Sequence, residues 1–156
     1  MKLDLIQPFI NAADAVLSEM LQQPVEIIDL AMQQTPDHAD GAAASIALDG
    51  DIEGNVLFAI DPKAAIVIAA ALNCDVTSRS TVVDVVCELA NLIVGNAIVT
   101  LNDNGFQFTV HPPQPQTANS PSIADRDSEA VLMRFNAGGT AVLMNISMRY
   151  CRAAHA

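Results

Sequence analysis

The sequence predicts an α+β domain in which helices pack on one antiparallel sheet, and three observations lead to this prediction. Two pairs of strand-like segments are each joined by a short Gly-containing turn, at residues 49–51 and 136–139, as is typical of β-hairpins. Hairpins pair their strands in antiparallel fashion. The segment 81–101 has the length and the nearly continuous apolar character of a buried helix. At 156 residues, the chain is expected to form one domain spanning residues 1–156.

Composition and charge exclude several classes of function. Apolar residues make up 51% of the chain and aromatic residues only 4%, so the core is expected to consist of Val, Ile, Leu, Ala and Met. The formal net charge of −11 argues against nucleic acid and anionic membranes as partners, because binding to phosphate groups depends largely on Lys and Arg. It also opposes an acidic protein partner unless a local cation makes the contact.

No targeting or membrane-spanning segment is expected. Asp4 and Gln7 precede any apolar run at the N-terminus, which argues against a secretory signal. The run at 64–72 is too short to cross a bilayer, and the segment 81–101 contains two carboxylates. The three cysteines are widely spaced without a C-x-x-C pattern, so neither a disulfide framework nor a metal site is expected. A cytoplasmic protein that holds no metal is the resulting expectation.

The order of the expected elements indicates two similar units that share one sheet. The first unit runs helix, strand, hairpin, helix, and the second runs helix, strand, long loop, hairpin. Pro8 is expected in the first turn of the first helix, and Asp61 followed by Pro62 is expected to begin the second. The expected segments are helices at 3–22, 63–72 and 81–101, strands at 25–32, 42–48, 52–60, 106–110, 129–135 and 140–149, a long loop at 111–128 and a tail at 150–156.

One narrow stripe of the helix at 81–101 is not apolar. Asp84, Glu88, Asn91 and Gly95 are spaced i, i+4, i+7 and i+11, so they share one helical face, whereas Asn96 is expected to point toward the core. Gly95 costs roughly 1 kcal/mol relative to alanine in a helix, which suggests that another molecule comes close there. The pattern fits either a solvated face of a core helix or a docking site, and it does not name a reaction.

The residue types limit the chemistry of this stripe. An asparagine amide cannot act as a general base, but it can donate and accept hydrogen bonds at once and so hold a water molecule. A phosphoryl group would repel the Glu88 carboxylate, so Glu88 is better assigned to a cation such as a partner's lysine. His38, His111 and His155 are expected at the surface and Cys87 in the packing. No Ser-His-Asp set, Gly-rich phosphate loop or metal-ligand cluster is readable, so the stripe suits an accessory that completes a partner's active site.

Four segments, taken in order, resemble the CheX/CheC/FliY family of chemotaxis phosphatases. The segment Glu88-Leu-Ala-Asn91-Leu-Ile-Val-Gly-Asn96-Ala is similar to the family signature, which is E-x-x-N on a long helix followed by a glycine and a small residue. Residues 8–12, PFINA, resemble the opening helix of CheX proteins, and residues 51–58, DIEGNVLF, resemble their second hairpin strand. His111-Pro-Pro113 falls where the family has a proline-containing strand end. The resemblance therefore covers nearly the whole chain.

The resemblance implies both a fold and a function. The implied fold has pseudo-duplicated α-β-X-β-β units, with about three helices packed on one antiparallel sheet of about six strands. The implied function is dephosphorylation of the phosphoaspartate of a CheY-like response regulator. The receiver domain of that regulator would supply Mg²⁺ and a lysine, so this chain would bind no cofactor. Asn91 would align a water molecule, Glu88 would pair with the receiver lysine, and Asp84 and Gly95 would flank the contact.

Other possibilities stay open beside this one. CheC-type members carry a second E-x-x-N on the first helix, but the nearest candidate here is Glu19-x-x-Gln22, so a single site is expected, as in CheX. A homodimer formed through the sheet is expected from the resemblance alone. The competing hypothesis is a non-catalytic, receiver-binding module of the same fold, related to the flagellar switch component FliM. A phosphatase that acts on a receiver outside chemotaxis is a third possibility.

Overall fold

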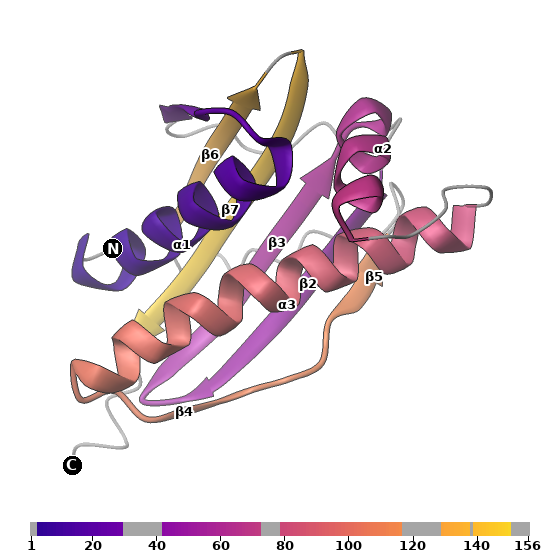
Figure 1. Ribbon diagram of the computed structural model, residues 1–156. Helices are drawn as coiled ribbons and strands as arrows, with labels where there is room; N and C mark the ends of the chain where they lie inside the picture. Colours follow the sequence, from indigo (N-terminus) through magenta and orange to yellow (C-terminus); the bar gives the residue numbers. More distant parts are fainter. Residues whose placement is uncertain (1–2, 30–41, 73–78, 117–128, 138, 151–156) are drawn as a thin grey trace.

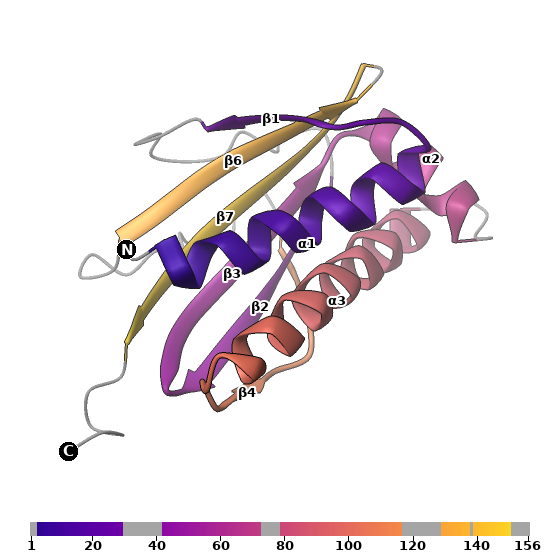
Figure 2. The same ribbon diagram turned by 60° about the vertical axis from the view of Figure 1, so that its left-hand side comes forward.

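Three helices cover one face of a single antiparallel sheet in the computed structural model, which describes residues 3–29, 42–72, 79–116, 129–137 and 139–150 (Figures 1 and 2). This arrangement confirms the predicted fold class. The helices are α1 (Leu3–Leu21), α2 (Pro62–Ala71) and α3 (Arg79–Asp103), and the strands are β1 (Glu26–Asp29), β2 (Ala42–Gly50), β3 (Ile52–Ile60), β4 (Phe108–Val110), β5 (Gln114–Gln116), β6 (Glu129–Ala137) and β7 (Thr140–Tyr150).

The strand order shows the duplication that the order of elements predicts. The sheet runs β1-β6-β7-β3-β2-β4, and β5 also pairs with β2. The two hairpins, β2–β3 and β6–β7, meet in the middle through the long antiparallel pair β3–β7. The outer strand of each half lies on the other half's hairpin, because β1 pairs with β6 whereas β4 and β5 pair with β2. The two halves are thus interleaved in one sheet.

The expectation of a loop throughout 111–128 is wrong at its beginning. Residues Gln114–Gln116 form β5, which pairs with β2 beyond the end of β4. Between the two short strands, the His111 N–H donates a hydrogen bond to the Ala47 carbonyl at 3.0 Å. Pro112 and Pro113 follow and have no N–H to donate, so the strand pairing along the outer edge of β2 is interrupted there. The rest of the expected loop, 117–128, lies outside the described residues.

The predicted start of the first helix at residue 3 is confirmed, but the places of Pro8 and Tyr150 differ from the sequence prediction. Helix α1 begins at Leu3, so Pro8 lies inside the helix instead of in its first turn. A proline there removes one intrahelical hydrogen bond, but Leu5 and Ile6 before it are buried in the core, which stabilises the preceding turn. Tyr150, assigned to the tail, belongs to β7 and pairs with Ile52. Residues 151–156 lie outside the described part of the chain.

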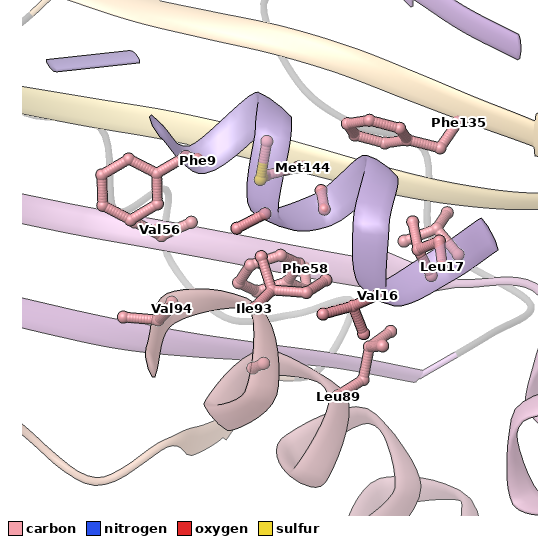
Figure 3. Close-up of a cluster of buried hydrophobic side chains, with 14 of the residues drawn as sticks. Phe9, Val16, Leu17, Val56, Phe58, Leu89, Ile93, Val94, Phe135 and Met144 are labelled. Carbon is pink, nitrogen blue, oxygen red and sulfur yellow. The ribbon is translucent and has the colours of Figure 1, made fainter. Parts of the chain in front are cut away.

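The core fills the space between the helices and the sheet. Phe9 from α1, Ile93 from α3 and Phe58 from β3 are fully buried in one cluster, and Figure 3 shows Phe58 beside Ile93 and Phe9 near Val56. Val16 and Leu89 join α1 to α3 in the same layer (Figure 3). Burial of such side chains supplies most of the free energy that holds α3 on the sheet.

Residues Val82–Asp103 are long and apolar enough to cross a membrane on length and composition alone. Their apolar side, however, packs in the core of the domain, against α1 and β2. A helix that packs in the core of a domain passes the same test of length and composition as a membrane-spanning one. Burial therefore explains the apolar residues on the core-facing side of α3.

Asp61 joins α2 to the beginning of β7. Its Oδ1 accepts a hydrogen bond from the Ala64 N–H at 2.7 Å, which caps the helix, and its Oδ2 accepts one from the Ala141 N–H at 3.0 Å. The Asp61 N–H also donates to the Ala141 carbonyl at 3.3 Å. The sequence predicts the cap, whereas the bond to β7 links residues 80 apart and only the fold shows it.

We expect Asp61→Ala to lower the free energy of unfolding by about 2 kcal/mol, because the substitution removes a helix cap and leaves the Ala141 N–H without its side-chain acceptor. Urea denaturation followed by circular dichroism measures the change. Asp61→Asn keeps one carbonyl oxygen and should lose less. Equal stability of Asp61→Ala and the parent would contradict the assigned role.

Candidate functional site

Helix α3 is the element that carries the predicted site. Its 25 residues lie beside α1 and across β2 (Figure 2). The side chains that face the core recur every three or four residues, which fixes the rotation of the helix about its axis. These buried residues are Val85, Val86, Leu89, Ala90, Ile93, Val94, Ala97 and Leu101.

The predicted stripe lies on the solvent side of α3. Asp84, Glu88, Asn91 and Gly95 are all exposed. Within the described part of the chain, the side chains of Glu88 and Asn91 make no hydrogen bond or ion pair. Since they stand one turn apart on one face of a helix held by the core, both polar groups are oriented and available to a partner.

Gly95 is not required by the packing of this chain. A Cβ atom placed there would meet nothing within 4 Å, and its backbone is ordinary helix. A mid-helix glycine is nevertheless destabilising by about 0.5–1 kcal/mol relative to alanine. The glycine therefore has no internal explanation.

The prediction that Asn96 points toward the core is wrong. Asn96 is exposed, and so are Val99 and Thr100 in the following turn. Helix α2 lies beside the N-terminal half of α3 only, so the C-terminal half exposes a wider arc (Figure 1). The exposed stripe also continues past Gly95 to Val99 and Asn102. Their spacing of i+4 and i+7 from Gly95 is the signal that could have found them.

Cys87 borders the stripe and is half-buried. Burial, and then the charge of the neighbouring Asp84, raise the pKa of its thiol above the ordinary value. A raised pKa keeps the thiol protonated at neutral pH, so Cys87 is a poor nucleophile and acts in packing. His38, His155, Cys74 and Cys151 lie outside the described residues.

Other ionisable side chains do not extend the site. His111 lies between β4 and β5, where its Nε2 is 3.5 Å from the Asp49 Oδ2, and both side chains are exposed. In the described ranges, no group of three or more His, Cys, Asp or Glu side chains could hold a metal ion. Among the described residues, the stripe on α3 therefore stays the candidate site.

Helix α1 does not repeat the pair of Glu88 and Asn91. Asn11 of α1 is the residue with a proline, Pro8, one turn before it, where Asn91 of α3 has Glu88. Asn11 is exposed, but Pro8 is buried and offers no carboxylate. The candidate Glu19-x-x-Gln22 does not form one helical face either, because Gln22 follows the end of α1 with a φ of 57°.

The fold defines a structural class, that of the CheC-like proteins. A crystal structure of a CheC-like protein from Shewanella oneidensis matches with a TM-score of 0.78 and 19% identity, over 96% of this chain and 100% of that one. The family model of the chemotaxis phosphatase CheX matches residues 42–136. The chain therefore belongs to the CheX family.

Two further structures resemble the chain. One is the CheX–CheY–BeF₃–Mg²⁺ complex from Borrelia burgdorferi, of which a chain matches at 27% identity with a TM-score of 0.75, over 95% of this chain and 99% of that one. The other is the FliM middle domain from H. pylori, at 13% identity with a TM-score of 0.61, over 99% and 95%. No protein with a curated description matches the sequence.

Proposed function

We propose that this chain dephosphorylates the phosphoaspartate of a CheY-like response regulator in chemotaxis. The observation that carries the proposal is the pair of Glu88 and Asn91, exposed one turn apart on the core helix of a member of the CheX family. Support comes from the relative in Borrelia burgdorferi, whose structure contains CheX together with CheY.

The proposed roles follow from the chemistry of the two side chains. The Asn91 amide holds a water molecule in line with the acyl phosphate, because it can accept from the water and donate to a phosphoryl oxygen at once. Glu88 pairs with a lysine of the receiver, which offsets the repulsion between this acidic chain and a phosphorylated partner. Asp84 and Gly95 flank the contact. The receiver supplies Mg²⁺, so this chain needs no cofactor of its own.

The reaction is a hydrolysis in which positioning is the main contribution of this chain. The water oxygen forms a bond to phosphorus while the bond from phosphorus to the aspartate oxygen breaks. The electron pair of that bond returns to the receiver carboxylate, and both protons of the water leave with inorganic phosphate as H₂PO₄⁻, which exchanges a proton with solvent at neutral pH. Correct placement of the water is worth about 10²-fold or more in rate.

The experiment that tests the proposal follows the loss of phosphate from a phosphorylated CheY-type receiver of the same organism, with Mg²⁺ present. We expect the chain to accelerate dephosphorylation at least about tenfold over the receiver alone. Binding without acceleration would support the non-catalytic module that the similarity to the FliM middle domain suggests. Failure with every receiver of the organism would contradict the proposed function.

Glu88→Ala is expected to weaken receiver binding and turnover together, because the carboxylate contributes a charge-assisted contact. A loss of about tenfold in affinity corresponds to such a contact. Titration of the receiver with and without the substitution measures it, and the neighbouring Asp84→Ala, at the rim, should lose less. An unchanged affinity for Glu88→Ala would show that Glu88 has no role in docking.

A cytoplasmic location and a homodimer are further parts of the proposal. The homodimer follows from the family resemblance alone, because the small apolar cluster on the sheet face opposite the helices, Ala43, Leu57 and Ala59 with Leu143, is already largely buried within one copy. Sedimentation velocity distinguishes the 16.5 kDa chain from a dimer of twice that mass.

A further inference from the structure

The solvent side of α3 changes character after Asn91. Toward the N-terminus it carries the carboxylates of Asp84 and Glu88, whereas residues 89–102 contain no charged side chain at all. On the exposed stripe, Asn91 is followed by Gly95 and then by Val99, whose side chain is 60% exposed. In a chain with a net charge of −11, an uncharged exposed helix surface of three turns is unusual.

The fold gives no reason for these residue types. Nothing within 4 Å occupies the space beside Gly95, so a larger side chain would fit there. Glycine and the β-branched valine are both weaker helix formers than alanine, lysine or glutamate, which exposed helix positions normally prefer. Local departures of this kind, where nothing inside the molecule compensates, are expected at functional surfaces.

We propose that Gly95 and Val99 form an apolar docking surface for an uncharged part of the receiver beside its phosphorylation site. This inference rests on the proposed function. With a rise of about 1.5 Å per residue, Gly95 lies about 6 Å and Val99 about 12 Å along the axis from Asn91. Both distances fall inside the footprint of an ordinary protein interface, about 800 Å² on each partner.

The two halves of the stripe then fix the direction in which α3 crosses the receiver. The acidic half, with Glu88, faces the receiver's lysine, and the neutral half faces a surface where charge would be costly to bury. The missing side chain of Gly95 lets the partner approach the helix backbone, and Val99 adds an apolar contact. A helix reversed end to end would place Val99 against the cation and Glu88 against the apolar surface, so one direction is favoured.

A second copy of this chain is a less suitable occupant of the same surface. A protomer that covered Val99 would also cover Asn91, about 12 Å away on the same face, and would exclude the receiver from the pair. Continuity with Glu88 and Asn91 therefore favours the receiver. Contact between copies is nevertheless one outcome that the experiment can detect.

The test measures the affinity of the receiver, loaded with BeF₃⁻ and Mg²⁺ as a stable phosphoryl mimic, for three proteins by calorimetry. Val99→Asp is expected to weaken binding at least about tenfold, because it places a carboxylate in an apolar contact. Thr100→Asp introduces the same charge at the next exposed residue, about 100° around the helix, and should bind within about twofold of the parent.

Gly95→Ala separates docking from folding. Alanine should raise the Tm of the free protein, because it is the better helix former and meets no neighbour, yet it should weaken receiver binding. In steady-state dephosphorylation, KM for the phosphorylated receiver should rise more than kcat falls. A purely structural role of Gly95 could not move stability and affinity in opposite directions.

Several results would overturn this inference. One such result is that Val99→Asp and Gly95→Ala bind within twofold of the parent while Glu88→Ala still binds weakly. This result would rule out the docking surface but leave the proposed function intact. A change of sedimenting mass in Val99→Asp without a change in receiver affinity would assign the surface to contact between copies. A parent protein that neither binds nor dephosphorylates the receiver would overturn the proposed function and this inference with it.

Discussion

Asn91→Ala is expected to remove nearly all acceleration of receiver dephosphorylation while the protein keeps its fold. The methyl group can neither accept from nor donate to a water molecule, so the attacking water loses its position. The expected loss is about 10²-fold in rate, or about 2.7 kcal/mol of transition-state stabilisation. Because Asn91 is exposed and alanine is a good helix former, α3 should be at least as stable as in the parent. Phosphate release from the phosphorylated receiver and a thermal melt measure the two quantities.

Asn96→Ala is the matched control for this experiment. It removes the same amide from an exposed position on the same helix, five residues further on and about 140° around the axis. This variant should dephosphorylate the receiver at the parental rate. The proposed mechanism is wrong if Asn91→Ala works as fast as the parent, or if both variants lose activity equally.

Among Gly→Ala substitutions at the glycines that the structure describes, Gly54→Ala is expected to destabilise the protein most. A Cβ atom at Gly54 would lie 2.0 Å from the Ser147 carbonyl oxygen and 2.7 Å from the Met148 Cα. These atoms belong to the backbone of β7, which pairs with β3 along its whole length in the middle of the sheet. The backbone cannot move aside without breaking that pairing, so the loss should be about 3 kcal/mol or more.

Two other glycines calibrate this result. Gly139 has a φ of +85° but open space around it, so Gly139→Ala should cost only about 1 kcal/mol, through backbone strain. Gly95→Ala should increase stability by about 0.5–1 kcal/mol. Urea denaturation of the three variants should therefore rank Gly54→Ala, Gly139→Ala and Gly95→Ala from least to most stable. A Gly54→Ala variant as stable as Gly139→Ala would contradict the close approach of β3 and β7.

Local patterns in the sequence are sufficient to predict most elements and the exposed stripe on α3. Alternation of apolar residues and turn chemistry predict both hairpins, and the Asp61-Pro62 pair predicts the beginning of α2, which the structure confirms. The i, i+4, i+7, i+11 spacing predicts that Asp84, Glu88, Asn91 and Gly95 share one exposed face. These features depend on contacts within a few residues of the chain, so short-range patterns contain them.

What the sequence could not supply depends on neighbours that are distant along the chain. The short strand β5 forms because β2 has backbone N–H and C=O groups available to pair with it. The pairing of β1 with β6, and of β4 with β2, places the outer strand of each half on the hairpin of the other half. Asn96 and Val99 are exposed because they lie beyond the part of α3 that α2 packs against. A helical pattern shows which residues share a face, but it does not show which neighbour buries that face. Periodicity thus determines the stripe, and tertiary packing determines how far it stays open to solvent.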